Sequence, residues 1–562
     1  MPTWLAPILA GVAVHGGIQL VEIDLILPHI GTALVCIGAA YVGVSVHLFN
    51  AASYVDAAVE LARAAALLAL GLTASMLVYR GWFHRLRRFP GPGLARFSKL
   101  YAVAVSARRV QWHRELEGWH GVYGDVVRTG PRELSIARAE AVAPLAACRK
   151  STLYALSDWN DDRLGLIETR SLADHRQRRK PWETALSTKA LAQYDPELQS
   201  TIGIFLDAIA TAGEGGAKAV NVTDWIAYLA YDLMGVVGFG RDFGQLRGGG
   251  VEHWAVRALR AQQLFIGVLK PVPWLLNALS KIPGADGPVR PFMSDTTSNT
   301  LINALYYLSR HPRHWRALQA SLAALFPGGP ASFTYARLAA GLADVPLLDA
   351  VINETMRLKP ATPGGNPRVT PPEGLRIALD DDEPLVVGGG GEQQPSRRRG
   401  EEGSPEGNRE KVLVIPGNTD VHISPYVLQR SPRYFACPND FVPERWIDDD
   451  DDDSAAQGGR PELVRDARKR GDGGASRAFF PFQVGQYACA GKALAMWEMR
   501  SVLARVALRF DLGWEEVGEG DEEGKAFDEG MRDTFTMTLG PMWLRFKERG
   551  RWWAEEGGES TG

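Results

Sequence analysis

The strongest chemical signal in the chain is FQVGQYACAGKALAMWEMR, residues 482–500. It sets a single cysteine, Cys489, between Gly485 and Gly491, and glycines let a backbone approach a bulky flat group closely. An amphipathic helical pattern follows at once, so a thiolate at Cys489 gains from the positive helix N-terminus. This arrangement suits an anionic metal ligand. Taken alone, a cysteine beside glycines is more often a small core residue, so the residues themselves leave both interpretations open.

Two charged motifs precede this stretch. ETMR, residues 354–357, places an acid and a base three residues apart, on one face of a predicted helix. PERW, residues 443–446, supplies a second arginine. If these charges are buried they must pair with one another, because an uncompensated buried charge costs several kcal/mol. Each string alone is common, and as a surface pair it contributes under about 1 kcal/mol.

Together, and in this order, the three motifs resemble the cytochrome P-450 superfamily of haem-thiolate monooxygenases. All four fixed positions of its cysteine-ligand loop, FxxGxxxCxG, are matched here, by Phe482, Gly485, Cys489 and Gly491. The resemblance implies that Cys489 is the axial ligand of the iron in haem b. Tyr487 departs from the pattern, since most members carry a basic residue there that pairs with a haem propionate. Weaker anchoring of the propionates is therefore expected.

The resemblance also implies roles for other charged residues. It assigns a structural ion network to Glu354, Arg357 and Arg445. His175 and Arg179 stand four residues apart on one helix face, and the family's pattern makes them donors to the haem propionates, together with Arg368. Each of these could be an ordinary solvated basic residue, although arginine suits planar carboxylate recognition best.

SDTTSNT, residues 294–300, resembles the oxygen-activating segment of the family, with Asp295 as proton relay and Thr296 as the hydrogen-bonding alcohol. The same residues would also make a helix N-cap. Phe292 and Met293 stand where the family has Ala-Gly, after the helix breaker Pro291. The interval before Asp295 is some tens of residues shorter than the resemblance implies. Two alternatives therefore stay open: a haem-thiolate isomerase or dehydratase, and a catalytically impaired haem or lipid-binding protein.

The first 80 residues predict a membrane anchor. Residues 4–21, 25–49 and 64–79 are apolar and nearly free of charge, enough for two or three spans of roughly 20 residues. The basic run RGWFHRLRR, residues 80–88, places the remaining chain in the cytosol by the positive-inside rule. The expected location is the membrane of the endoplasmic reticulum. The alternative to a membrane anchor is that these apolar segments form a buried helical hairpin. Residues 81–93, ending in FPGPG, form a basic and proline-rich hinge.

Composition narrows the remaining possibilities. The balance of 62 basic and 65 acidic side chains makes nucleic acid an unfavoured partner, and four scattered cysteines predict neither a disulfide framework nor a structural zinc site. A mainly helical domain with small sheets is expected over residues 94–546, with helices at 223–238 and 300–325 and strands within 126–136 and 412–416. Residues 380–411 and 448–474 are expected to be solvated insertions, and residues 547–562 a polar tail.

The predicted function follows from the resemblance. It implies insertion of one oxygen atom from O2 into an apolar small molecule, with NADPH as electron source through a separate flavoprotein reductase, since the chain has no GxGxxG strand–turn–helix unit. Residues 122–136 and the apolar start are most similar to fungal secondary-metabolite members of the tryprostatin-hydroxylase kind. The sequence carries no chemical signature for the substrate, its site of oxidation or the oligomeric state.

Overall fold

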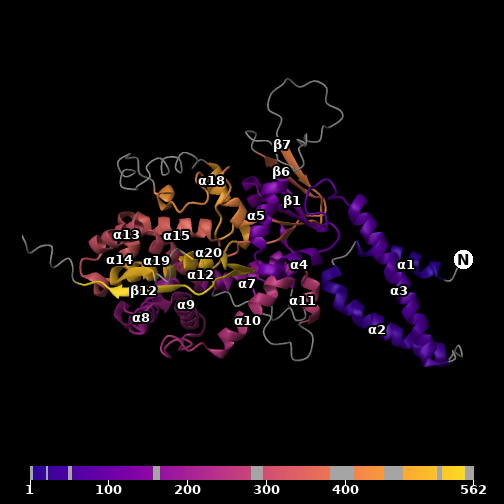
Figure 1. The fold of residues 1–562 in the computed structure, drawn as a ribbon, viewed down its shortest axis with the longest axis horizontal. Helices are drawn as coiled ribbons and strands as arrows, with labels where there is room; N and C mark the ends of the chain where they lie inside the picture. Colours follow the sequence, from indigo (N-terminus) through magenta and orange to yellow (C-terminus); the bar gives the residue numbers. More distant parts are fainter. Residues whose placement is uncertain are drawn as a thin grey trace, which may run out of the picture.

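The computed structural model describes residues 4–19, 23–47, 53–155, 165–279, 295–379, 411–447, 473–514 and 522–550. The two predicted insertions lie almost wholly outside these residues, as do Pro291, Phe292, Met293 and most of the C-terminal tail. The expected fold class is confirmed: a mainly helical body with small sheets follows a group of apolar N-terminal helices (Figure 1).

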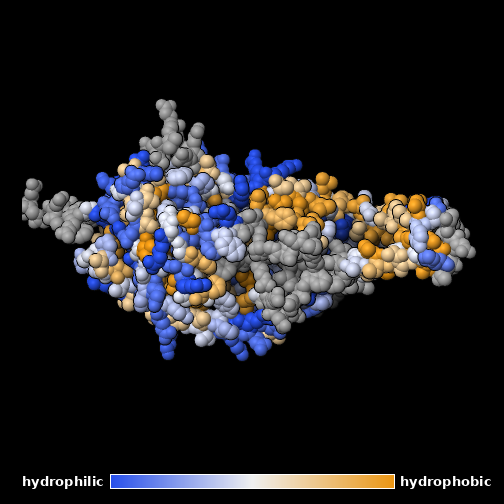
Figure 2. Space-filling view, turned by 90° about the horizontal axis from the view of Figure 1, so that it is seen from below, coloured by the Kyte–Doolittle hydropathy of each residue, from blue (hydrophilic) through white to orange (hydrophobic). Residues whose placement is uncertain are grey.

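The N-terminal helices project from one end of the body (Figure 1). They are α1 (Leu5–Ile18), α2 (Ile23–His47) and α3 (Tyr54–Val78), which continues as the π-helical turn η1 (Tyr79–Phe83). Two stretches are long and apolar enough to cross a membrane, Ile30–His47 and Tyr54–Phe83, whereas α1 is shorter. Hydrophobic residues gather on these projecting helices in Figure 2.

Glycines set the packing of α1 on α3. A Cβ added to Gly11 would lie 2.2 Å from the carbonyl oxygen of Leu68, and one added to Gly71 would lie 2.2 Å from that of Ile8. Small residues let two helix backbones approach this closely. The α1–α3 pair is therefore a tight unit that any larger side chain at either glycine would separate.

The helical core lies at the centre of the body. Its main helices are α8 (Thr188–Ala212), α9 (Val222–Phe239), α12 (Asp295–Arg310), α13 (Pro312–Leu325), α15 (Pro346–Leu358) and α19 (Lys492–Arg509). The predicted continuous helix 300–325 is wrong in one respect. Pro312 cannot donate a backbone hydrogen bond and instead starts α13 at its first turn, so the pattern divides into α12 and α13.

Smaller helices surround this core. They are α4 (Leu100–Arg109), α5 (Trp112–Tyr123), α6 (Val142–Ala146), α7 (Leu172–Ala185), α10 (Trp254–Leu269), α11 (Pro273–Leu279), α14 (Tyr335–Ala340), α16 (Pro425–Leu428), α18 (Gly473–Ala478) and α20 (Glu522–Glu529). The apolar α11 packs against α2, so it links the body to the N-terminal helices.

A five-stranded sheet lies beside the N-terminal helices. Its order is β1 (Val126–Gly130), β2 (Glu133–Ile136), β8 (Asp420–His422), β5 (Arg368–Val369) and β3 (Arg149–Lys150). In the antiparallel β3–β5 pair, Lys150 stands opposite Arg368. This register places two cations from distant parts of the sequence side by side.

Three smaller sheets complete the fold. One joins β4 (Val220–Asn221), β12 (Trp543–Glu548) and β9 (Phe510–Trp514). The other two are the antiparallel pairs β6 (Leu375–Leu379) with β7 (Lys411–Ile415), and β10 (Arg532–Thr534) with β11 (Thr536–Thr538).

Candidate functional site

Cys489 lies in a tight loop between the 3-10 turn η10 (Gly485–Tyr487) and α19. Its backbone N–H donates to the carbonyl oxygen of Phe482 at 2.8 Å, and Ala488 N–H donates to Gly485 at 3.1 Å. Gly485 has φ +69°, a conformation that glycine adopts without strain. The loop thus holds the cysteine by its backbone and leaves the side chain exposed.

The surroundings of the Cys489 thiol oppose its ionisation. Desolvation by protein atoms on its inner side raises the pKa of Cys489, while the Gly491 N–H and Arg179 act in the opposite direction. Arg179 is tied to the loop, because its guanidinium donates to the carbonyl oxygen of Ala488 and to Glu183 at 2.6 Å. A metal cation at the sulfur would supply the missing stabilisation, since a coordinating thiol is deprotonated.

A group of cations gathers around the ring of Tyr487, two residues before the cysteine. Lys150 Nζ lies 4.8 Å from the ring centroid and the Arg368 guanidinium carbon 4.9 Å. The ring of His175, on α7, meets the same tyrosine edge-on at 4.9 Å. All four side chains are buried, with at most 9% of their surface exposed. Sequence reasoning missed Lys150, because only the β3–β5 register brings it to Arg368.

Among the described residues, no carboxylate forms an ion pair with this cation cluster of Lys150, His175 and Arg368, and Glu183, which acts on His175, is itself paired with Arg179. The Lys150 ammonium donates to the carbonyl oxygens of Leu166 at 3.1 Å and Ile167 at 2.7 Å, and no carboxylate pairs with Lys150 or Arg368 in the described ranges. His175 Nδ1 and Arg368 Nε are buried there without a hydrogen-bond partner. Such orphaned donors are expected where a ligand is bound.

Burial and mutual repulsion lower the pKa values of the basic groups in this cluster. Burial and then the neighbouring Arg368 lower the pKa of Lys150 to about 7. Burial, Lys150, Arg179 and Arg368, in that order, lower the pKa of His175 to about 4. An anion carrying planar carboxylates would satisfy both the unpaired donors and the unbalanced charge.

Glu354 is the centre of a buried ion network. Its carboxylate accepts from Arg357 at 2.8 and 2.9 Å, and Arg445 Nε approaches both of its oxygens at 3.1 Å. Val442 N–H and Trp446 Nε1 add hydrogen bonds of 3.0 and 2.9 Å. The three charged residues span 91 positions of the sequence, and the fold brings them into contact.

The two arginines of this network are also satisfied by backbone. Arg357 donates to the carbonyl oxygens of Gln429, Pro438 and Asp440. Arg445 donates to those of Ala436 and Cys437. The network therefore fixes the segment before the cysteine loop onto α15.

Asp295 is the first residue of α12 and is held from two other helices. Tyr231 on α9 donates to one carboxylate oxygen at 2.9 Å, and Gln263 on α10 donates to the other. Thr296 follows it and is partly buried, and among the described residues its hydroxyl forms no hydrogen bond. The orientation of the acid is thus set by tertiary contacts, in addition to its place at a helix N-terminus.

A second acid that the sequence analysis missed faces α12 from α19. Glu498 is buried, and burial raises its pKa to about 8, opposed by its hydrogen bond with Thr297. Its Oε1 has no partner among the described groups. At neutral pH the group is therefore mainly the uncharged acid, and it joins the cysteine helix to the residue after Thr296.

Comparison with known proteins places this fold and site in one family. The family model of cytochrome P-450 matches residues 294–373 and 409–529. The cytochrome P-450 monooxygenase orf5 of Eupenicillium brefeldianum is 32% identical, with 85% of this chain and 95% of the relative covered. The chain therefore belongs to the cytochrome P-450 family. It is a haem-dependent monooxygenase, an oxidoreductase similar to those of fungal secondary metabolism.

Other relatives agree. The cytochrome P-450 monooxygenase sthD of Phaeosphaeria nodorum is 30% identical, covering 86% of this chain and 99% of the relative. Tryprostatin B 6-hydroxylase of Aspergillus fumigatus is 28% identical, covering 82% and 81%. The solved haem domain of cytochrome P450DA has a TM-score of 0.54 at 16% identity, covering 82% and 97%, which supports the fold.

The alignments also indicate that this chain has gaps relative to these proteins within the matched region. Those with orf5 and sthD run over 536 and 543 positions but use only 85% and 86% of its 562 residues. These relatives therefore carry several tens of residues that this chain lacks.

The described residues fit the haem that membership in this family implies. The exposed thiol of Cys489 has the chemistry of a ligand for its iron, and the orphaned donors of His175 and Arg368, with Lys150, suit its two carboxylates.

Proposed function

We propose that this chain hydroxylates an apolar small molecule of fungal secondary metabolism, with Cys489 as the axial haem ligand. The observation that carries the proposal is the exposed thiol beside a buried, uncompensated cation cluster. When bound, haem supplies oxygen activation, favoured by electron donation from the thiolate. The remaining residues hold this group, exclude water and deliver protons.

We assign the propionate carboxylates to Lys150, His175 and Arg368. Most members of the family carry a basic residue at the position of Tyr487. Lys150 provides the positive charge here instead, since its ammonium lies against the ring of Tyr487. Arg179 contributes to the site indirectly. Its guanidinium donates to the Ala488 carbonyl oxygen and adds positive charge near the Cys489 sulfur. Phe482, Gly485 and Gly491 shape the loop that carries the ligand. Glu354, Arg357 and Arg445 keep that region of the chain folded.

Replacing the cation cluster is expected to weaken haem binding. In Arg368→Gln the cluster loses the group best suited to a carboxylate, and the haem content of purified protein should fall by about tenfold or more. Lys150→Met should act in the same direction. The measurement is haem per polypeptide from the pyridine haemochrome spectrum, with Arg376→Gln, an exposed arginine on β6, as the matched control. Unchanged haem content in both cluster variants would contradict the assignment.

Proton delivery is assigned to Asp295 and Thr296. Tyr231 and Gln263 orient the carboxylate, and the adjacent Thr296 hydroxyl can pass a proton onward because no other hydrogen bond occupies it among the described residues. Electrons come from NADPH through a separate flavoprotein reductase. The helices α2 and α3 anchor the chain in the endoplasmic reticulum, with residues 80–88 and the body on the cytosolic side.

The experiment that tests this function is reconstitution of the full chain with reductase, NADPH and O2 against a panel of apolar small molecules. Tryprostatin B is included as a probe, because a relative is named for its hydroxylation. The expected product carries one added oxygen and requires every component. Turnover of a probe without NADPH or reductase would contradict the monooxygenase assignment for this chain and favour an isomerase or dehydratase.

Thr296→Ala is expected to separate NADPH consumption from product formation. Loss of the hydroxyl removes a positioned proton path, which contributes about 100-fold or more in rate. Product should fall by about that factor, while NADPH oxidation continues and releases hydrogen peroxide. Ser309→Ala, at the other end of α12, is the control. Equal product per NADPH in wild type and Thr296→Ala would remove Thr296 from the mechanism.

A further inference from the structure

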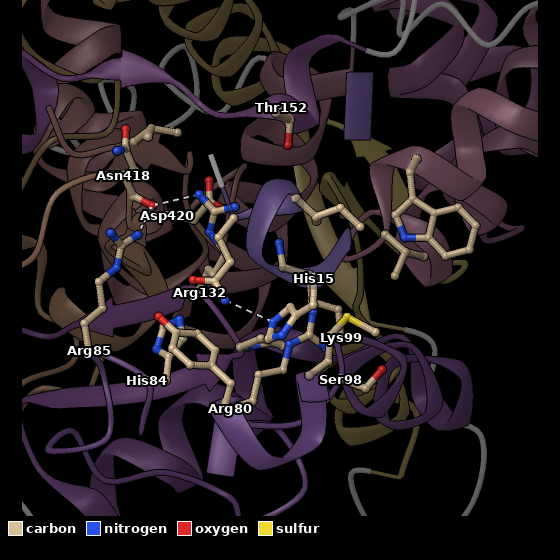
Figure 3. Close-up of a pocket in the computed structure, with 18 of the residues that line it drawn as sticks. His15, Arg80, His84, Arg85, Ser98, Lys99, Arg132, Thr152, Asn418 and Asp420 are labelled. Carbon is tan, nitrogen blue, oxygen red and sulfur yellow. Dashed lines mark hydrogen bonds between the residues drawn. The ribbon is translucent and has the colours of Figure 1, made fainter. Parts of the chain in front are cut away.

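A cavity with no lining residue from the cysteine loop lies between the N-terminal helices and the body (Figure 3). Its volume is about 640 Å³. α1, the end of α3, η1, the start of α4, α11 and the five-stranded sheet contribute to its walls. The cavity therefore exists only where the proposed anchor meets the catalytic body, and the function proposed above uses none of it.

Three arginines form one wall of this anchor cavity. Arg80, Arg85 and Arg132 all line it. Their guanidinium groups donate to backbone carbonyl oxygens: Arg80 to Phe97 at 2.6 Å, and Arg85 and Arg132 to Asn418 at 2.8 and 3.3 Å. Within the described residues, no carboxylate forms an ion pair with any of the three. Each guanidinium thus keeps donors that an anion could take.

Other charges at the cavity do not neutralise this wall. Lys99 lines it as well, but its ammonium is paired with Glu133 at 3.0 Å. Asp420 is the one carboxylate among the lining residues, and it has further contacts of its own. The electrostatic balance of the described lining is therefore strongly positive.

The buried His84 reports this positive field. Burial, followed by Arg128, Arg85 and Arg132, lowers the pKa of His84 to about 3. Its Nδ1 accepts a hydrogen bond from Leu86 N–H at 3.1 Å, so the ring is neutral. Arg85 has its own pKa lowered by burial and by Arg132. A neutral histidine does not add to the repulsion, yet the arginines still lack an anion.

Apolar side chains also line the cavity. They are Ile18, Met76, Val272 and Trp274, from α1, α3 and the region of α11. The apolar stretch Tyr54–Phe83 ends at the same level, next to the arginines. If that stretch crosses a bilayer, the cavity opens where headgroups meet acyl chains, a depth at which tryptophan and arginine are favoured.

We propose that this anchor cavity binds the phosphate headgroup of an anionic phospholipid. Arg80, Arg85 and Arg132 would hold the phosphate, since the guanidinium fork matches its oxygens. The apolar lining residues would receive the start of the acyl chains. The inference rests on the proposed membrane anchorage, and it makes the lipid a structural link between anchor and body.

The test is lipid retention by the full-length protein, solubilised from vesicles of equal phosphatidylcholine and phosphatidylserine and analysed by native mass spectrometry. The wild type is expected to retain phosphatidylserine in preference. Arg85→Gln/Arg132→Gln should reduce that retention by about tenfold, because charge-assisted hydrogen bonds are lost. Arg316→Gln, an exposed arginine on α13, should leave it unchanged, and Arg132→Lys should retain part of it.

Three results would overturn the inference. Equal retention of both lipids by the wild type would show no anion selectivity, whether or not the variants fold. If the double variant retained as much phosphatidylserine as the wild type, Arg85 and Arg132 would not be the residues that bind the headgroup. Binding of inorganic phosphate that displaces the lipid fully would identify a site for small free anions. Membrane flotation and the haem spectrum, measured on the same samples, report separately on anchorage and on the proposed function.

Discussion

Cys489→Ala is expected to abolish thiolate-bound haem. The wild type in membranes should give a strongly red-shifted Soret band in the reduced, carbon monoxide difference spectrum, and the variant should give none. The reason is that the Cys489 thiolate is the proposed ligand of the iron, on a loop whose backbone hydrogen bonds do not depend on the side chain. The loop should therefore persist while the ligand is lost.

Cys36→Ala is the matched control for this result. Cys36 is also an exposed cysteine, but it lies on α2, far along the chain from the cation cluster. Its spectrum should equal that of the wild type. An unchanged red-shifted band in Cys489→Ala would contradict the ligand assignment, and a loss of the band in Cys36→Ala would mean that the spectrum reports general damage.

Glu354→Ala is expected to destabilise the body by about 3–5 kcal/mol, the cost of leaving buried charges unpaired. The carboxylate is fully buried and compensates two arginines that are themselves buried, so water cannot take its place. We expect little folded haem protein to accumulate. The measurement is the midpoint of thermal unfolding followed by the haem band, together with resistance to limited proteolysis.

Asp349→Asn provides the comparison on the same helix. Asp349 pairs with Arg500 at 2.6 and 2.7 Å, but both side chains are partly exposed. An ion pair open to solvent contributes about 1 kcal/mol or less, so a small change is expected. If Glu354→Ala unfolds no more readily than Asp349→Asn, the buried network does not stabilise this chain.

Local sequence patterns were sufficient for much of the fold. Predicted segments 223–238 and 412–416 correspond to α9 and β7, and residues 126–136 contain β1 and β2. These patterns succeed because alternation and helical periodicity reflect burial of one face. The apolar spacing on either side of Pro312 predicts one continuous helix, but the proline begins a new helix in the structure.

The sequence by itself determined the family and predicted both Cys489 as the haem ligand and the charges of the Glu354 network, because each is written in a short motif. Only the tertiary structure decided that Lys150 stands beside Arg368 and that Glu498 faces α12. It alone placed Arg85 and Arg132 in one cavity. Sheet register and helix packing join residues hundreds of positions apart, and such pairings depend on the whole core, which no local pattern records.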